Sequence, residues 1–80
     1  MANNAPVENL RDGRLQAAIW ANTGAESKTF HSVTLTRSYK EEGGDWKETS
    51  QLNEADLLRA ANLLTQAYNK IKDIEHVKNA

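Results

Sequence analysis

The fold of this chain is decided by residues 30–64, which read FHSVTLTRSYKEEGGDWKETSQLNEADLLRAANLL. The first part, Phe30–Glu41, is rich in Ser, Val, Thr and Tyr, as strands are. Glu41–Asp45 then places two glycines among acids, which indicates a hairpin turn. Asp45–Leu52 is short and polar, as edge strands often are. The segment predicts a β-hairpin that leads directly into a helix beginning after Asn53.

The start of this helix carries a complete capping sequence. Asn53 is a favourable N-cap residue, and Asp56 stands three residues later as the acid of a capping box. Leu52 and Leu57 frame the cap as a hydrophobic staple. Apolar residues then recur at spacings of three and four in two stripes, which are Leu57, Ala61, Leu64, Tyr68 and Ile71, and Ala60, Leu63, Ala67 and Ile74. We expect a helix from Glu54 to about His76.

The residues before the hairpin predict another strand. Arg14–Asn22 alternates with period two, so that Leu15, Ala17, Ile19 and Ala21 share one face. Asn22–Lys28 is a loop of turn-forming residues. Val7–Leu10 precedes the turn signal Asp12-Gly13, and whether it forms a further strand stays open. The predicted fold is α+β, β-β-β-α: a curved antiparallel sheet of three to four strands, followed by one long C-terminal helix.

The chain is small, and its apolar helix surface is large. Its 80 residues form one predicted domain, 7–76, between a disordered tail at 1–6 and a frayed end at 77–80. Domains of this size bury only about 60% of their unfolded surface, and no Cys is present to form a disulfide. A helix of about 34 Å would overhang strands of under about 20 Å. We therefore predict a homodimer through the helix, with its interface at Leu63, Leu64, Tyr68, Ile71 and Ile74.

Composition narrows the classes of function. The net charge of −1 argues against binding duplex nucleic acid by bulk electrostatics. Charge is nevertheless uneven, since residues 11–40 carry five cations against two anions and residues 41–56 carry six anions against one cation. No apolar run approaches a membrane span, and the N-terminus lacks signal-peptide features. We expect a cytoplasmic protein that does not contact a membrane.

No constellation of catalytic residues is evident. The two histidines, His31 and His76, lie far apart, and no His-x-x-x-His or Cys-x-x-Cys spacing exists. Gly43-Gly44 is too short for a phosphate loop and stands among acids. We therefore expect no enzyme, no cofactor and no metal site.

A sheet with one helix beside it has one covered face and one bare face, and the bare face is the candidate site. The predicted strands place a mixture of cations, hydroxyls and aromatics there, namely Arg14, Gln16, Trp20, Phe30, Thr34, Thr36 and Lys40. Trp20 has two interpretations. It is an ordinary cross-strand packing residue, or it is a platform on which bases stack. The charges likewise are either a solvated surface or contacts for phosphates. The orientation of Tyr39 stays open because one bulge would reverse it. Trp46 is either a third aromatic of the bare face or a core residue, since it shares parity with Leu52.

The order of these elements resembles the transcriptional positive-cofactor-four (Whirly-related) family of single-stranded-DNA-binding proteins. The matching elements are Tyr39, the turn Glu41-Glu42-Gly43-Gly44, Trp46-Lys47, the cap Leu52-Asn53-Glu54 and the helix after it, with Arg11–Trp20 as the earlier turn and strand. The resemblance implies a homodimer formed through the helix and a strand-lined channel for unpaired DNA. It implies nucleic-acid-facing roles for Arg14, Trp20, Phe30, Arg37, Lys40, Trp46 and Lys47. Thr49, Ser50 and Gln51 stand where the family carries more Lys and Arg.

Two functions follow as hypotheses. The first is a dimeric binder of single-stranded DNA or RNA, acting as an accessory factor in transcription or replication. The alternative is a small protein-interaction module, or a mobile-element accessory protein, that binds a protein partner and no nucleic acid. The net charge of −1, the acidic turn and the surplus apolar surface of the helix favour the alternative.

Overall fold

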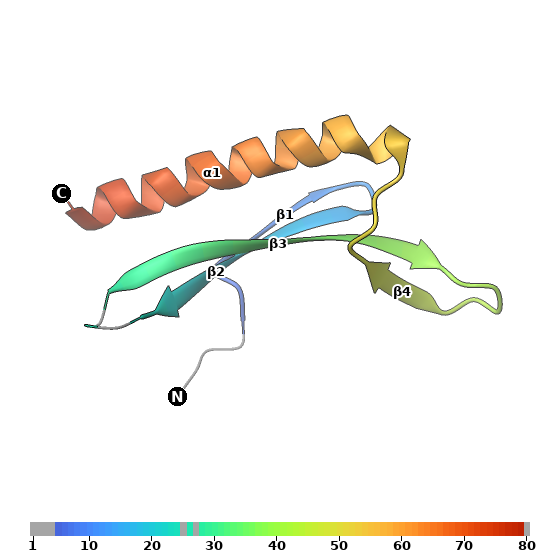
Figure 1. Cartoon of the computed structure of the whole chain (residues 1–80), viewed down its shortest axis with the longest axis horizontal. Helices are drawn as coiled ribbons and strands as arrows, with labels where there is room; N and C mark the ends of the chain where they lie inside the picture. Colours follow the sequence, from blue (N-terminus) through green and yellow to red (C-terminus); the bar gives the residue numbers. More distant parts are fainter. Residues whose placement is uncertain (1–4, 25, 27, 80) are drawn as a thin grey trace.

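The computed structural model describes residues 5–24, 26 and 28–79, with side chains described as far as Glu75. Four antiparallel strands form one open sheet in the order β1-β2-β3-β4, and α1 lies along one face of it (Figure 1). The elements are β1 Glu8–Asp12, β2 Leu15–Thr23, β3 Thr29–Lys40, β4 Trp46–Thr49, the 3₁₀ turn Glu54–Asp56 and α1 Leu57–Asn79. The predicted α+β class, with a single C-terminal helix, is confirmed.

The segment before the first turn is a strand. β1 pairs with β2 from Glu8 opposite Ile19 to Asp12 opposite Leu15, which leaves Gly13 and Arg14 as the two turn residues. Gly13 adopts φ +62°, a conformation that favours glycine. The question left open at Val7–Leu10 is thereby answered, with the strand displaced by one residue at its start and extended to Asp12.

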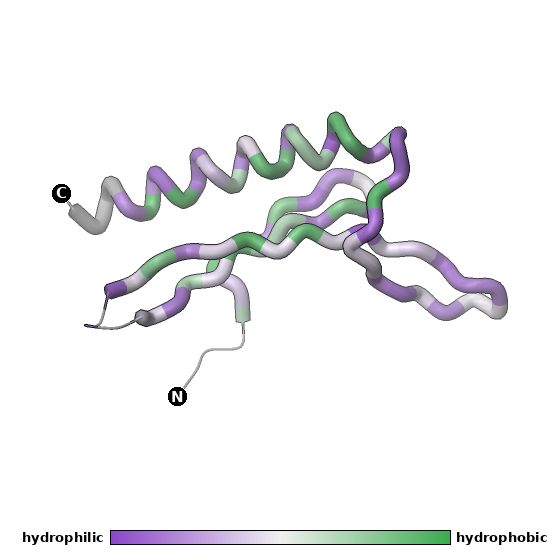
Figure 2. The backbone as a smooth tube through the Cα atoms, viewed as in Figure 1, coloured by the Kyte–Doolittle hydropathy of each residue, from purple (hydrophilic) through white to green (hydrophobic). Residues whose placement is uncertain are grey.

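The core lies between β2 and α1 and is built from small and medium side chains. Leu15, Ala17 and Ile19 of β2 are almost fully buried, as are Ala60, Leu63 and Ala67 of α1. Leu10, Val33, Leu35 and Leu52 pack against this cluster from the sides. Figure 2 shows the apolar segments recurring along α1 and along the strands that it covers. The alanines allow the helix to lie close to the sheet.

The two apolar stripes of α1 have different environments. Ala60, Leu63 and Ala67 face the sheet, so Leu63, which is 1% exposed, belongs to the core and is not available as an interface residue. The other stripe is open: Leu57, Ala61, Leu64 and Tyr68 are exposed, and Ile71 is half-buried. The sheet thus covers one of the two stripes and leaves the other exposed.

The prediction that the helix extends well beyond the strands is wrong. β3 has 12 residues and β2 has 9, so at about 3.3 Å per residue they span about 40 Å and about 30 Å. Glu75, in the C-terminal half of α1, places its Oε2 atom 3.5 Å from Nδ1 of His31 on β3. The helix therefore runs along the sheet for most of its length (Figure 1).

The ends of the predicted domain differ slightly from expectation. Residues 1–4 of the predicted tail lie outside the described residues, as does Ala80. The backbone of α1 continues to Asn79, beyond the expected end near His76.

Candidate nucleic-acid interface

The face of the sheet opposite α1 is defined by the strand register. Residues that pair across neighbouring strands point to the same side, and the side chains of one strand alternate. Asn9 pairs with Ala18, Ala18 with Thr34, and Lys40 with Trp46. We call the resulting surface the bare face; it comprises Asn9, Arg11, Arg14, Gln16, Ala18, Trp20, Asn22, Phe30, Ser32, Thr34, Thr36, Ser38, Lys40, Trp46 and Glu48.

Polar side chains of the bare face are linked to one another. Arg11 Nη2 donates to Gln16 Oε1 at 2.9 Å, and Gln16 Nε2 donates to Asn9 Oδ1 at 2.6 Å. Asn22 Nδ2 donates to Ser32 Oγ at 3.0 Å. These bonds hold side chains from β1, β2 and β3 in fixed positions across the surface. The face is therefore an ordered polar surface.

Trp20 lies on β2 opposite Ser32, one bare-face pair away from Phe30. Its Nε1–H donates to Thr34 Oγ1 at 3.0 Å across β2 and β3. The residue is half-buried, so part of the indole remains accessible. Because the indole N–H already has a partner, Trp20 can offer a ligand only the surface of its ring.

Phe30 lies toward one end of the bare face, where β3 begins. Its side chain is 53% exposed. A Cβ atom on Gly24 would lie 3.2 Å from Cε1 of Phe30, so the absence of a side chain there lets the loop approach the ring. The phenyl ring is thus supported on one side by the loop and open on the other.

Trp46 occupies the opposite end and is 58% exposed. The guanidinium carbon of Arg14 lies 5.3 Å from the centroid of its ring, and Nζ of Lys40 lies 6.0 Å away. Both distances fall within the range of cation–π contacts. The exposed part of the ring offers a stacking surface, and the two cations over the ring offer contacts for phosphates. The facing of Trp46, open from the sequence, is therefore toward the bare face.

Arg37 and Lys47 lie on the other side of the sheet. Arg37 pairs with Leu15, donates from Nε to the Gln51 carbonyl at 3.0 Å and lies 3.6 Å from Asp56 Oδ2. Lys47 pairs with Tyr39, and its Nζ lies 3.9 Å from Glu41. Tyr39 shares this side, with the Arg37 guanidinium 5.8 Å from its ring. The structure thus brings together Arg14, Trp20, Phe30, Lys40 and Trp46 of the predicted set and separates Arg37 and Lys47 from them.

The sequence pattern missed the contribution of β1. Asn9 and Arg11 reach the bare face only because Glu8–Asp12 pairs with β2. The turn signal Asp12-Gly13 was the available clue, since a two-residue turn requires a strand on each side.

The bare face is more positive than the whole chain. Arg11, Arg14 and Lys40 are opposed there by Glu48 alone, an excess of two positive charges on a protein whose net charge is −1. This local excess favours an anionic ligand. Its small size favours modest affinity that weakens with salt.

Within the described residues, no group of three or more His, Cys, Asp or Glu side chains is arranged to hold a metal ion. No helix in the described part of the chain is long and apolar enough to cross a membrane. Comparison with family models, with curated proteins and with solved structures gave no significant match.

Proposed function

We propose that this protein binds single-stranded nucleic acid through the bare face. The observation that carries the proposal is the group formed by Trp46, Arg14 and Lys40, in which two cations lie over a partly exposed ring. Bases stack on such rings for about 1–3 kcal/mol each, whatever their sequence. Phe30 and Trp20 extend the aromatic surface along β2 and β3. The proposed role is that of a cytoplasmic accessory factor in transcription or replication, in keeping with the resemblance to the positive-cofactor-four family.

The preference for a single strand follows from the shape of the surface. Aromatic rings on an open sheet can stack only with bases whose faces are accessible, which paired bases in a duplex do not offer. The excess of two positive charges is also too small for strong duplex binding by charge alone. Hydroxyl and amide groups between the rings suit contacts with sugars and base edges.

We also propose that the protein acts as a homodimer through the open stripe of α1, Leu57, Ala61, Leu64, Tyr68 and Ile71. Glu75 continues the spacing of this stripe and contacts His31, so the stripe lies on the β3 side of the helix. Thr29–Thr36 of β3 pair with β2 on one side, but β4 pairs only with Arg37–Lys40, so the other edge of Thr29–Thr36 has no strand partner among the described residues. A second copy covering the stripe would also reach this open edge. Contact between two copies would bury apolar side chains that one sheet leaves exposed.

The second candidate function is a protein-interaction module, and the same stripe is the observation that favours it. Tyr68 is 61% exposed and Leu64 is 44% exposed, on a helix whose other stripe is already buried. An amphipathic helix of another protein could cover this surface as well as a second copy could. In that case the bare face would be a solvated surface without a ligand.

A titration with a fluorescent oligo-dT of about twenty nucleotides separates the two functions. The only two tryptophans of the chain, Trp20 and Trp46, both lie on the bare face, so tryptophan fluorescence reports on that surface. We expect quenching on binding, with a log–log salt slope of about −2 if three cations each neutralise a phosphate. Absence of binding at low salt would overturn the nucleic-acid proposal and favour the protein partner.

A further inference from the structure

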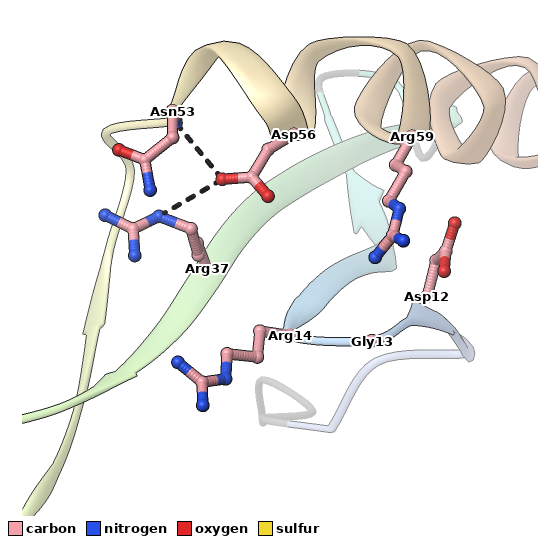
Figure 3. Close-up of a pocket in the computed structure, with 7 residues that line it drawn as sticks. All are labelled: Asp12, Gly13, Arg14, Arg37, Asn53, Asp56 and Arg59. Atoms are coloured by element: carbon pink, nitrogen blue, oxygen red, sulfur yellow. Dashed lines mark hydrogen bonds and ion pairs between the residues drawn. The ribbon is translucent and has the colours of Figure 1, made fainter.

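A polar cavity of about 370 Å³ lies at one end of the sheet, apart from the centre of the bare face. The turn between β1 and β2, the end of β3 and the start of the helix meet there (Figure 3). Its lining residues are Asp12, Gly13, Arg14, Arg37, Asn53, Asp56 and Arg59. The distinctive feature of this cavity is three arginines from three different elements.

Arg37 is held in place by its neighbours. Its Nε donates to the carbonyl of Gln51 at 3.0 Å and lies 3.6 Å from Oδ2 of Asp56. The same carboxylate oxygen accepts the Asn53 N–H at 3.1 Å, as Figure 3 shows. Within the described residues, no hydrogen bond uses the terminal amino groups of Arg37. The contacts at Nε therefore orient the guanidinium, and its terminal amino groups remain as donors for a ligand.

Arg59 has no carboxylate within ion-pair distance in the described part of the chain. It extends from α1 toward the turn at Gly13, and a Cβ atom at Gly13 would lie 3.2 Å from its Nη1 (Figure 3). The glycine thus leaves room for the guanidinium above the turn. Sequence reasoning did not select Arg59, because its proximity to residue 13 exists only in the folded chain.

The charges of the cavity leave a positive excess. Three arginines and two aspartates line it, a sum of one positive charge. Asp56 is already engaged by Arg37 and by the N–H of Asn53. The other charged residues of the lining are Arg14, Arg59 and Asp12, two cations and one anion. Guanidinium groups present paired N–H donors that match the oxygens of phosphate.

We infer that this cavity binds a phosphate monoester. The dianion of a monoester suits a cavity lined by three arginines better than the single charge of a phosphodiester inside a chain does. Arg14 joins the cavity to the bare face, because the residue lines the cavity and its guanidinium lies 5.3 Å from the centroid of the Trp46 ring. The terminal phosphate of a single strand on the bare face would thus reach the cavity, a step that rests on the proposed function. A free phosphorylated small molecule carries the same group.

The test uses inorganic phosphate and three forms of one oligo-dT: unphosphorylated, 5′-phosphorylated and 3′-phosphorylated. Phosphate titrations are followed by amide NMR shifts at Gly13 and Arg59. We expect phosphate to move both signals, and one terminal phosphate to tighten oligonucleotide binding about tenfold, as charge-assisted hydrogen bonds would. Arg59→Gln should abolish the shifts and the tenfold gain while leaving binding of the unphosphorylated strand unchanged. Lys70→Gln removes one positive charge from the same helix outside the cavity and serves as the matched control.

Each outcome has a distinct meaning. Phosphate shifts that disappear in Arg59→Gln, without any oligonucleotide binding, would support the cavity while the proposed function fails. Oligonucleotide binding that gains nothing from a terminal phosphate, with the phosphate shifts present, would assign the cavity to a free phosphorylated compound. Phosphate shifts that are absent, or unchanged in Arg59→Gln, would overturn the inference and leave the bare face as a separate question.

Discussion

The guanidinium of Arg14 lies 5.3 Å from the ring of Trp46, which joins the turn between β1 and β2 to the edge strand β4. This contact is possible because β3 carries both neighbours: Ser38 N–H donates to the Arg14 carbonyl at 2.8 Å, and Lys40 pairs with Trp46. Arg14 and Trp46 are far apart in the sequence but in contact in the folded chain.

Trp46→Ala tests whether this contact binds a ligand. The ring is 58% exposed, so its loss should leave the fold intact and weaken oligonucleotide binding by about 1–3 kcal/mol. Fluorescence anisotropy of labelled oligo-dT measures the affinity, and thermal unfolding checks the fold. Trp46→Phe retains a ring and should recover part of the affinity. Equal binding by wild type and Trp46→Ala would remove Trp46 from the interface.

Trp20→Ala should affect both binding and stability. The substitution removes a stacking surface worth about 1–3 kcal/mol and also the partner of the Thr34 hydroxyl. The hydrogen bond itself contributes about 1 kcal/mol to folding. Trp20→Phe keeps a ring without the N–H, and Thr34→Val removes the acceptor without touching the ring. Binding lost in Trp20→Ala but kept in Trp20→Phe and Thr34→Val would establish stacking, whereas unchanged binding in all three would contradict it.

Asp56→Ala should destabilise the protein more than Glu54→Ala, a change in the same turn. Asp56 Oδ2 accepts the Asn53 N–H and pairs with Arg37, and both side chains of the ion pair are about four-fifths covered. Loss of a cap costs about 0.5–2 kcal/mol, and Arg37 would also lose its carboxylate partner. Urea unfolding measures the change. Glu54→Ala removes an exposed acid from the same turn and should cost a few tenths of a kcal/mol.

Much of this fold is predictable from local patterns, and the reasons are visible in particular residues. The buried residues Leu15, Ala17 and Ile19 occupy every second position of β2, and the stripes of α1 repeat over several turns. Such repeated patterns remain recognisable even where single residues depart from them. β1 is harder to predict because Glu8 and Asp12 place charged residues on the face where Leu10 packs against the core. The facing of Trp46 required an unbroken register from Arg37 to Lys40, which only the pairing of β3 with β4 establishes.

The site is less predictable than the fold. The preference of Arg37 for Asp56 depends on how the loop after β4 returns to the sheet, which no spacing in the sequence encodes. The approach of Arg59 to Gly13 likewise depends on where α1 crosses the β1–β2 turn. Contacts between distant segments are set by packing. Residues of the same type, such as Arg37 and Arg59, therefore have different contacts in the folded chain.

The two neighbouring leucines of α1 provide the test of the dimer. Leu63 is 1% exposed in the core, and Leu63→Ala should cost about 2–5 kcal/mol of folding stability through the cavity left behind. Leu64 is 44% exposed on the open stripe, so Leu64→Asp should leave the folded monomer intact. In a dimer the new carboxylate would be buried without a partner, which would dissociate the two copies. Sedimentation equilibrium across micromolar concentrations gives the mass, and circular dichroism the helix content. Wild type should have the mass of two chains and Leu64→Asp that of one; a monomeric wild type would refute the dimer and favour a different protein on the same stripe.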